Sequence, residues 1–152
     1  MPSFLYDHIV SFEETNALGN VYFTNFLKWQ GICRELFLKE RAPELLPQLS
    51  GGMKIATLHC SCSYYWELYA FDRVVVEMYL NDSSESGKSL ESGVLWICFK
   101  YWKNADPDRL LVGEGEQKIA FMYPTDGTRW ERGPIPDSLQ NALVPYGFIK
   151  AW

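Results

Sequence analysis

The feature that most constrains how this chain folds is a helix-forming segment that is apolar around most of its circumference. Its large apolar side chains do not fall on one stripe: Tyr22, Phe23, Phe26, Leu27, Trp29, Ile32, Cys33, Leu36, Phe37 and Leu38. A helix with this pattern is expected to be buried on most sides. Arg34 and Glu35 stand inside it, and their charges must be paired, hydrated by a cleft, or used on a ligand.

The segments around this helix predict an α+β domain in which an antiparallel β-sheet wraps around a long central helix. A first strand is expected at residues 4–12, followed by a polar turn at 13–20. The helix should end near Ala42, because Pro43 disfavours a helical conformation in the residue before it. Pro43 can also start a further turn.

Later runs rich in β-branched and aromatic residues predict four more strands, at 54–69, 73–80, 90–103 and 110–122. Their polar connections suit hairpins and are too short for crossover helices. A short closing helix is expected at 136–143. The sequence contains no internal repeat, so we expect residues 1–152 to form a single domain.

Charge and cysteine usage narrow the possible functions. The formal net charge of -5 comes without a basic patch, which argues against nucleic acid as a partner. No apolar run is long enough to cross a bilayer and no secretion signal is evident, so we expect a cytoplasmic protein with no membrane partner. The cysteine spacing matches neither a zinc site nor a disulfide framework, which predicts buried reduced thiols and no metal or bound cofactor. His8 and His59 are expected to be ordinary strand residues.

Several residues occur in an order that resembles the 4-hydroxybenzoyl-CoA thioesterase group of hot-dog-fold enzymes: Phe12, Asn16, Gly19, Val21, Tyr22, Asn25, Leu27 and Trp29. A closer resemblance, to the thioesterases of enediyne polyketide biosynthesis, is carried by the motifs FEETN, GNVYF, NFLKWQG, CREL, FDR and QKIAFM. The likeness covers residues 6–122. It implies a single hot-dog domain that dimerises by joining two sheets edge to edge, commonly pairs further into a tetramer, and has active sites between subunits.

The resemblance also implies hydrolysis of an acyl thioester carried on the phosphopantetheine of CoA or of an acyl carrier protein. In the enediyne branch, the acyl chain is a long conjugated polyketide of antibiotic biosynthesis. Release of a β-keto acid, with or without decarboxylation, is the implied outcome. The implied partners are the acyl carrier protein domain of a polyketide synthase and further copies of this chain.

Four residues are candidates for catalysis by resemblance. Asn16 stands where many relatives carry a catalytic aspartate, and the enediyne branch also has asparagine there; it is expected to hydrogen-bond the thioester carbonyl or a water. Arg34 matches an arginine of that branch and is expected to stabilise the oxyanion. The alternatives are a structural ion pair of Arg34 with Glu35 or Glu14, or an arginine at the surface. Glu35 is considered as a base or an orienting group, and Thr57 as a hydroxyl near the thioester.

Six residues are candidates for contacts with the substrate: Gly19, Tyr22, Phe23, Phe26, Gly31 and Tyr65. Phe23 and Phe26 replace a histidine and a tyrosine found in other relatives. Gly31 weakens the helix, which suggests the close approach of a ligand or a second subunit. Tyr65 belongs to a group of aromatic residues that can line a tunnel for a flat polyene. Alternation along a strand prevents all of that group from sharing one face.

Two other functions remain open. A general acyl-CoA thioesterase would use the same fold, although the aspartate and the histidine of such enzymes are replaced by Asn16 and Phe23. A non-catalytic module that binds acyl groups would also fit a chain that lacks the usual base, because function resides in the site and not in the fold.

Overall fold

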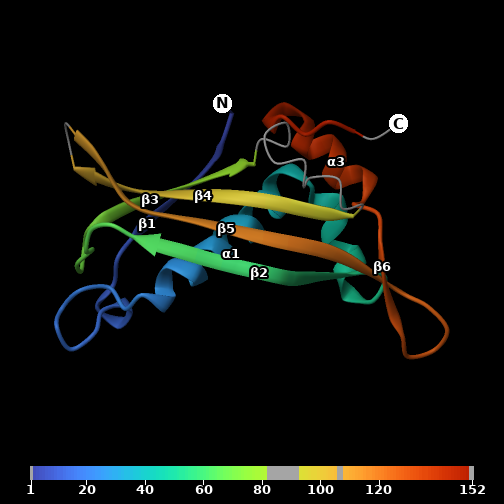
Figure 1. The fold of residues 1–152 in the computed structure, drawn as a ribbon, viewed down its shortest axis with the longest axis horizontal. Coiled ribbons are helices and arrows are strands. Elements are labelled where there is room, and N and C mark those ends of the chain that lie inside the picture. Colours follow the sequence, from blue (N-terminus) through green and yellow to red (C-terminus); the bar gives the residue numbers. More distant parts are fainter. Residues whose placement is uncertain (1, 82–92, 106–107, 151–152) are drawn as a thin grey trace.

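The computed structural model describes residues 2–81, 93–105 and 108–150, and it contains one antiparallel sheet. Its strands are β1 (Phe4–Ile9), β2 (Lys54–Tyr64), β3 (Arg73–Leu80), β4 (Val94–Ala105), β5 (Asp108–Pro124) and β6 (Trp130–Gly133). They are ordered β1-β3-β4-β5-β2, and β6 pairs with the end of β5 (Figure 1). The two edges of this order are therefore β1 and β2.

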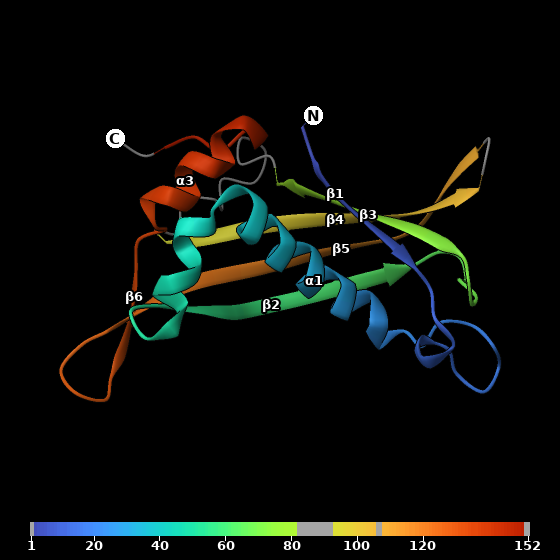
Figure 2. The same cartoon turned by 180° about the vertical axis from the view of Figure 1, so that it is seen from behind.

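One long helix lies across one face of the sheet. The helical elements are α1 (Thr24–Arg41), α3 (Asp137–Leu143) and the 3-10 segments η1 (Phe12–Glu14), η2 (Pro43–Ser50) and η3 (Val144–Tyr146). Figure 2 shows α1 against the sheet, with η2 and α3 gathered near the end of the sheet where α1 finishes. No helix in the described part of the chain is long and apolar enough to span a membrane.

The helix is buried along the side that meets the sheet, as its composition predicts. Its buried residues include Phe26, Trp29, Cys33, Phe37 and Leu38. At its C-terminal end, Ala42 donates its backbone N–H to the carbonyl of Leu38 before Pro43 begins η2. The expected helix end and the further turn are both confirmed.

The expectation that the apolar run is buried on most sides is wrong at its beginning. Tyr22 and Phe23 precede α1, and their exposed fractions are 48% and 54%. They were assigned to the buried helix because apolar residues alone do not mark where a helix starts. The helix start is instead joined to the preceding loop, since the Asn25 side chain donates a hydrogen bond to the backbone carbonyl of Glu14 (2.8 Å).

The α+β architecture predicted from the sequence is confirmed, and the strand boundaries differ in understandable ways. The strand at 73–80 matches β3, while the strand at 54–69 ends early, at Tyr64. The first strand is also shorter, because the chain turns into η1 at Phe12. The strand β6 was not predicted, because it has only four residues. Residues 90–92 and the connection at 82–92 lie outside the described residues.

Two glycines of β5 allow α1 and β2 to approach this strand closely. A Cβ atom at Gly115 would lie 2.6 Å from the carbonyl oxygen of Ser61 and would overlap the side-chain amide of Gln30. At Gly113, a Cβ would lie 2.8 Å from the carbonyl oxygen of Ser63. Real Cβ atoms do not approach oxygen this closely, so any larger residue here must push neighbouring strands or the helix apart.

Alanine at Gly115 and at Gly31 should have opposite effects on stability. We expect Gly115→Ala to lower the free energy of unfolding by about 1–3 kcal/mol through overpacking. A Cβ at Gly31 meets nothing within 4 Å. Gly31→Ala should therefore raise the free energy of unfolding by about 0.5–1 kcal/mol, the helix preference for alanine over glycine. Urea unfolding of both variants at equal protein concentration measures this, and a destabilising Gly31→Ala would contradict the open space beside it.

Candidate functional site

Arg34 extends from α1 across the sheet toward its β2 edge. Its Nη1 donates hydrogen bonds to Oε1 of Gln117 on β5 (3.0 Å) and to Oγ1 of Thr57 on β2 (3.3 Å). Both acceptors are neutral, so they orient the guanidinium without cancelling its charge. Burial lowers the pKa of Arg34, and the nearby Glu35 charge partly opposes this effect. A guanidinium nevertheless stays protonated at neutral pH.

A β-bulge places Thr57 beside this guanidinium. The register of β2 against β5 shifts between Thr57 and His59, so Leu58 is the extra residue. Thr57 is paired with Ile119, whose side chain is buried on the α1 side, whereas His59 is paired with Lys118. Without the shift, residues 57 and 59 would share one face of the strand. Bulges commonly re-aim side chains near functional sites, and this one separates Thr57 from His59.

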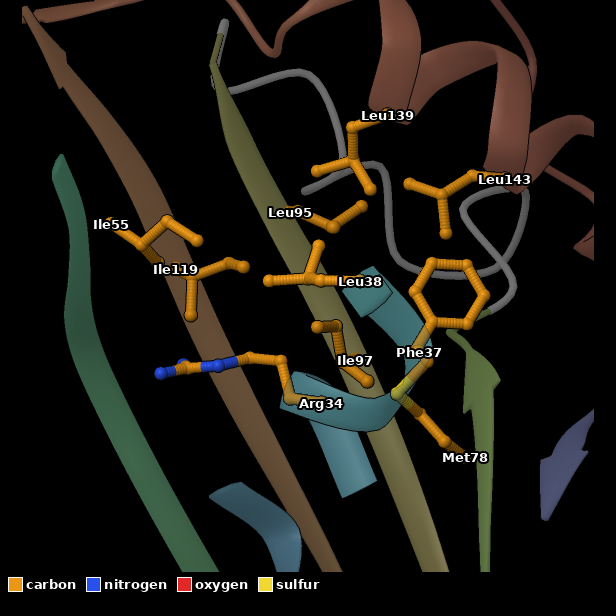
Figure 3. A pocket seen from close by; sticks show the side chains of 10 residues that line it. All are labelled: Arg34, Phe37, Leu38, Ile55, Met78, Leu95, Ile97, Ile119, Leu139 and Leu143. Atoms are coloured by element: carbon orange, nitrogen blue, oxygen red, sulfur yellow. The ribbon is translucent and has the colours of Figure 1, made fainter. Parts of the chain in front are cut away.

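A narrow apolar pocket begins beside the aliphatic part of Arg34. It is lined by Arg34, Phe37, Leu38, Ile55, Met78, Leu95, Ile97, Ile119, Leu139 and Leu143. Figure 3 shows these side chains converging from α1, the sheet and α3, while the guanidinium extends away toward β5 and β2. An apolar pocket next to one fixed cation suits a ligand with a hydrocarbon chain and a polar or anionic head.

Arg34 does not form the ion pair that was considered as the alternative to a role in catalysis. Glu35 is exposed, and no hydrogen bond or ion pair joins it to Arg34 within residues 2–81, 93–105 and 108–150. Neighbouring positions on a helix point about 100° apart, which explains the separation of the two side chains. Glu14, the other proposed partner, is bound elsewhere.

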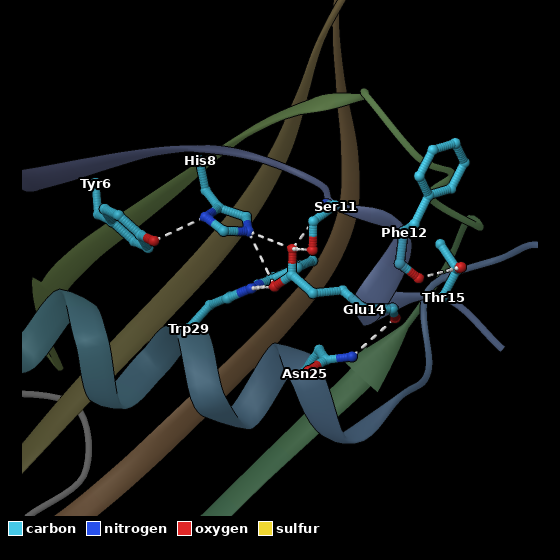
Figure 4. A network of polar contacts seen from close by, with 8 residues as sticks. All are labelled: Tyr6, His8, Ser11, Phe12, Glu14, Thr15, Asn25 and Trp29. Carbon is cyan, nitrogen blue, oxygen red and sulfur yellow. Dashed lines mark hydrogen bonds and ion pairs between the residues drawn. The ribbon is translucent and has the colours of Figure 1, made fainter.

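Glu14 is buried in a separate polar network on the β1 side of α1 (Figure 4). Its carboxylate accepts hydrogen bonds from Nε1 of Trp29 (2.6 Å) and from the backbone N–H of Ser11 (2.9 Å). It also contacts Nε2 of His8 (2.7 Å), whose Nδ1 is 2.8 Å from the hydroxyl of Tyr6. Burial favours the protonated acid, but the surrounding donors outweigh it, so the pKa of Glu14 is below its ordinary value. This network joins β1, η1 and α1.

Asn16 lies in the loop that this network anchors. Its Oδ1 accepts a hydrogen bond from the backbone N–H of Leu18 (2.9 Å), and its backbone carbonyl accepts one from Gly19 (2.9 Å). Gly19 has φ of 91°, a conformation that favours glycine and closes the turn. The Nδ2 group of Asn16 makes no hydrogen bond to the described residues and can donate to a ligand.

The structure separates the candidate residues into two groups within one subunit. Arg34 and Thr57 are in contact, whereas Asn16 and Gly19 lie beyond the opposite end of α1. From Asn25, at the start of the helix, to Arg34, the helix rises by about 14 Å. A single copy of the chain therefore does not bring Asn16 to Arg34.

The aromatic candidates surround the start of α1. Tyr22 and Phe23 are in edge contact, and the Tyr64 hydroxyl donates to the carbonyl of Phe23 (3.0 Å). Phe26 is buried and packs against Tyr64 and other core aromatic rings. Tyr65 is exposed, and its hydroxyl donates to Glu114 (3.3 Å). None of these candidates lines the pocket beside Arg34 among the described residues.

Gln30 and Gln117 were not predicted as site residues. Gln30 is fully buried on α1, and Gln117, 5% exposed, connects it to Arg34. A glutamine inside an otherwise apolar helix run is a signal in the sequence that Gln30 must have a buried partner. Nothing in the local sequence around Gln117 identifies that partner, because 87 residues separate the two.

The cysteines are less uniformly buried than expected. Cys33 is buried, Cys60 is exposed, and Cys62 and Cys98 are half-buried. Burial raises the pKa of Cys33 to about 12 and those of Cys62 and Cys98 to about 11. These three groups are therefore thiols at neutral pH and poor nucleophiles.

Replacing Glu14 by glutamine should test the second network. We expect Glu14→Gln to lower the free energy of unfolding by about 1–3 kcal/mol at pH 7, because the amide adds a donor where donors already converge. The pKa of Glu14 is lower when folded, so its contribution is complete above the unfolded pKa and is lost as the pH falls through the folded pKa. The difference between the two proteins should therefore shrink in acid.

Urea unfolding from neutral to acidic pH measures this difference. Glu40→Gln removes an exposed carboxylate from α1 and serves as the control, with an expected change below about 0.5 kcal/mol. A Glu14→Gln deficit that is equal at every pH would contradict an ionised Glu14 as its source.

Comparison with known proteins gives several matches. No family model matches the chain. The 1,4-dihydroxy-2-naphthoyl-CoA hydrolase of Prochlorococcus marinus (strain NATL1A) is 28% identical over 108 residues, 64% of this chain. The chain thus spans 65% of the length of that curated relative.

Solved structures match over nearly the whole chain. A 1,4-dihydroxy-2-naphthoyl-CoA thioesterase from Synechocystis has a TM-score of 0.75 at 19% identity, covering 94% of this chain and 96% of that one. A variant 4-hydroxybenzoyl-CoA thioesterase bound to 4-hydroxybenzoyl-CoA has a TM-score of 0.76 at 14% identity, covering 92% and 97%. At such identities, the two likenesses concern the fold alone.

The dynemicin thioesterase provides a stronger match, with a TM-score of 0.85 and 36% identity over 95% of this chain and 97% of that one. Its crystal structures are described as revealing induced-fit and allosteric effects upon polyene binding. The identity and coverage of this match extend the likeness from the fold to the sequence. The chain belongs to the hot-dog thioesterase family, as its helix wrapped by an antiparallel sheet and its motifs led us to expect.

Proposed function

We propose that this protein hydrolyses the thioester of a long apolar acyl chain, of the polyene or β-ketoacyl polyketide kind, carried by an acyl carrier protein. The observation that carries the proposal is Arg34, which is oriented by two neutral acceptors at one side of an apolar pocket. The pocket takes the hydrocarbon chain, and the guanidinium takes the oxygen that becomes negative during hydrolysis.

The proposed role of Arg34 follows from the negative charge that develops on the thioester oxygen during hydrolysis. Attack of water on a thioester gives a tetrahedral oxyanion, and a preorganised donor aimed at it stabilises the transition state by about 3–4 kcal/mol. Arg34 supplies N–H donors and a full positive charge to this oxygen. The Thr57 hydroxyl already accepts from Arg34, so it retains a proton with which it can orient the carbonyl or the water. Glu35, exposed on the same helix, is the nearby carboxylate available as a base.

We further propose that the site is completed by a second copy of the chain. β2 is an edge of the sheet, and no described strand pairs with its outer side. Antiparallel pairing of two β2 strands is a two-fold symmetric arrangement in which the start of one strand lies beside the end of the other. Because Tyr64 at the end of β2 contacts Phe23, this pairing carries the partner's loop toward Thr57 and Arg34. Asn16 then donates to the same thioester from across the interface.

The polyene substrate is supported by the dynemicin thioesterase, whose polyene binding is described as involving induced fit. The pocket here is narrow, and a conjugated chain would need to separate α3 from the sheet side chains that it packs against. We propose that the partner of this protein is the carrier protein of a polyketide synthase in the cytoplasm, and that the chain assembles as a dimer or tetramer. Decarboxylation of a released β-keto acid is also part of this proposal.

The alternative is a thioesterase that acts on aromatic acyl-CoA substrates. It is favoured by the 1,4-dihydroxy-2-naphthoyl-CoA hydrolase match, although that match covers only part of both chains. A narrow pocket lined mostly by aliphatic side chains suits an acyl chain better than a hydroxylated ring, because buried hydroxyl groups would lack partners there.

Thiol release from two kinds of substrate tests the proposal. The wild-type protein should release thiol from a β-ketoacyl thioester on a carrier protein faster than from an aromatic acyl-CoA. Arg34→Ala should lower kcat by about 100- to 1,000-fold, the effect of losing one oxyanion donor. Detection of carbon dioxide in the same reactions reports decarboxylation.

Arg41→Ala is the matched control, because it removes an exposed arginine from the last turn of the same helix. It should leave kcat unchanged. Equal kcat for Arg34→Ala and the wild type would remove Arg34 from the mechanism, and preference for the aromatic acyl-CoA would favour the alternative. A folded wild type that binds acyl groups without releasing thiol would support a binding module instead.

A further inference from the structure

A chain of buried amides connects Arg34 to the backbone of β2. Nη1 of Arg34 donates to Oε1 of Gln117, and Nε2 of Gln117 donates to Oε1 of Gln30 (3.1 Å). Nε2 of Gln30 then donates to the carbonyl oxygen of Ser61 (3.0 Å). The two glutamine side chains are almost fully buried, so each bond in this chain replaces a hydrogen bond to water.

The two ends of this chain determine the orientation of both amides. The Ser61 carbonyl can only accept, so it requires the NH2 group of Gln30, whose oxygen then faces Gln117. That oxygen requires the NH2 group of Gln117, which turns the oxygen of Gln117 toward Arg34. A guanidinium can only donate, so reversing either amide would place donors against donors or acceptors against acceptors.

The packing around Gln30 leaves space for this arrangement. The side-chain amide of Gln30 crosses from α1 to Ser61 over Gly115, where even a Cβ atom would overlap it. This position is therefore filled by an amide where a close-packed core would ordinarily hold a hydrocarbon. Apolar packing at this position would stabilise the core more than an amide does, so the amide is explained by its hydrogen bonds to Ser61 and Gln117 and not by the filling of space.

Glutamine differs from glutamate in what it does to Arg34. Both present an oxygen to the guanidinium, but a carboxylate would form an ion pair and cancel its charge. The amide orients the guanidinium and leaves its charge for an incoming anion. Thr57, the other acceptor of Nη1, is likewise neutral.

We propose that Gln117, held by Gln30, is a positioning residue that fixes the Arg34 guanidinium in a charged, oriented state for the head group of the ligand. The inference rests on the proposed function, because the reaction supplies the oxyanion, and it adds the residues that prepare Arg34. The ligand chemistry is an anionic oxygen joined to a long hydrocarbon chain, whether an oxyanion intermediate or the carboxylate product.

Two substitutions at Gln117 separate charge from orientation. Gln117→Glu supplies a carboxylate that pairs with Arg34, so kcat for thiol release and the affinity for decanoate should each fall by at least about tenfold at pH 7.5. Gln117→Met keeps the size but removes the acceptor. It should lower kcat by about tenfold while the affinity for decanoate stays within about threefold, because the charge remains.

Thiol release measures kcat and KM, and isothermal titration calorimetry measures binding of decanoate to the same proteins. Gln48→Glu, which makes the same chemical change at an exposed residue of η2, is the control and should resemble the wild type in both assays. Thermal unfolding establishes that each variant is folded. If Gln117→Glu does not fold, Gln117→Met decides the outcome, through a lower kcat at an unchanged affinity for decanoate.

The inference and the proposed function can fail separately. Wild-type kcat and wild-type decanoate affinity in Gln117→Glu, or wild-type kcat in Gln117→Met, would overturn the inference while leaving hydrolysis intact. A wild-type protein that releases no thiol, yet binds decanoate in a manner that Gln117→Glu weakens and Gln117→Met does not, would overturn the proposed function and support the positioning of Arg34.

Discussion

The burial of α1 against the sheet is the constraint on which the rest of this structure depends. A helix pressed against a sheet must satisfy every polar side chain that it carries inside, because water cannot reach those groups. Trp29, Gln30 and Arg34 are three such residues, and each has a partner outside α1: Glu14 of η1 for Trp29, and residues of β2 for Gln30 and Arg34. The loop before α1 supplies Glu14 to Trp29, Gly115 of β5 leaves room for Gln30, and the bulge of β2 places Thr57 beside Arg34.

The two sides of α1 resolve the problem of a buried charge in opposite ways. On the β1 side, Glu14 is surrounded by donors from Ser11, His8 and Trp29, so its charge is fully used within the protein. On the β2 side, Arg34 is held by a hydroxyl and an amide oxygen, and its charge is still available. The first arrangement is that of a structural anchor, and the second leaves a positive charge that an anionic ligand can use. The hydrogen-bond partners of Glu14 and Arg34 reveal this difference, which burial alone would not.

Most of this fold can be predicted from the sequence, because most of its helices and strands are specified by residues within the same segment. The apolar run before Pro43 and the β-branched segment that became β3 are each recognisable without knowledge of their neighbours. The start of α1 is not recognisable in this way, because it depends on a hydrogen bond from Asn25 to Glu14. The four-residue strand β6 is not recognisable either, because it depends on pairing with β5.

The candidate site was predictable only in part, for the same reason. Arg34 is conspicuous because it is a charge in an apolar helix, and resemblance to known thioesterases pointed to Thr57. Gln117, its other acceptor, is 83 residues away, and only the register of β5 against β2 brings it there. The residue that holds Arg34 is thus invisible to a local pattern. The same pattern could not decide against the alternative, an ion pair of Arg34 with Glu14 or Glu35.

The asparagine at position 16, where many relatives carry an aspartate, agrees with the neutral acceptors of Arg34. An ionised aspartate at position 16, brought near Arg34 by a second subunit, would compete with the oxyanion for the same guanidinium. In the proposed dimer, Asn16 would instead add an N–H donor, while Gln117 and Thr57 present uncharged oxygens to Arg34. The three groups proposed to meet the Arg34 guanidinium directly, Asn16, Gln117 and Thr57, are therefore all neutral. A site that stabilises a transient negative charge requires this, since a permanent anion bound to the guanidinium would neutralise it before the substrate arrived.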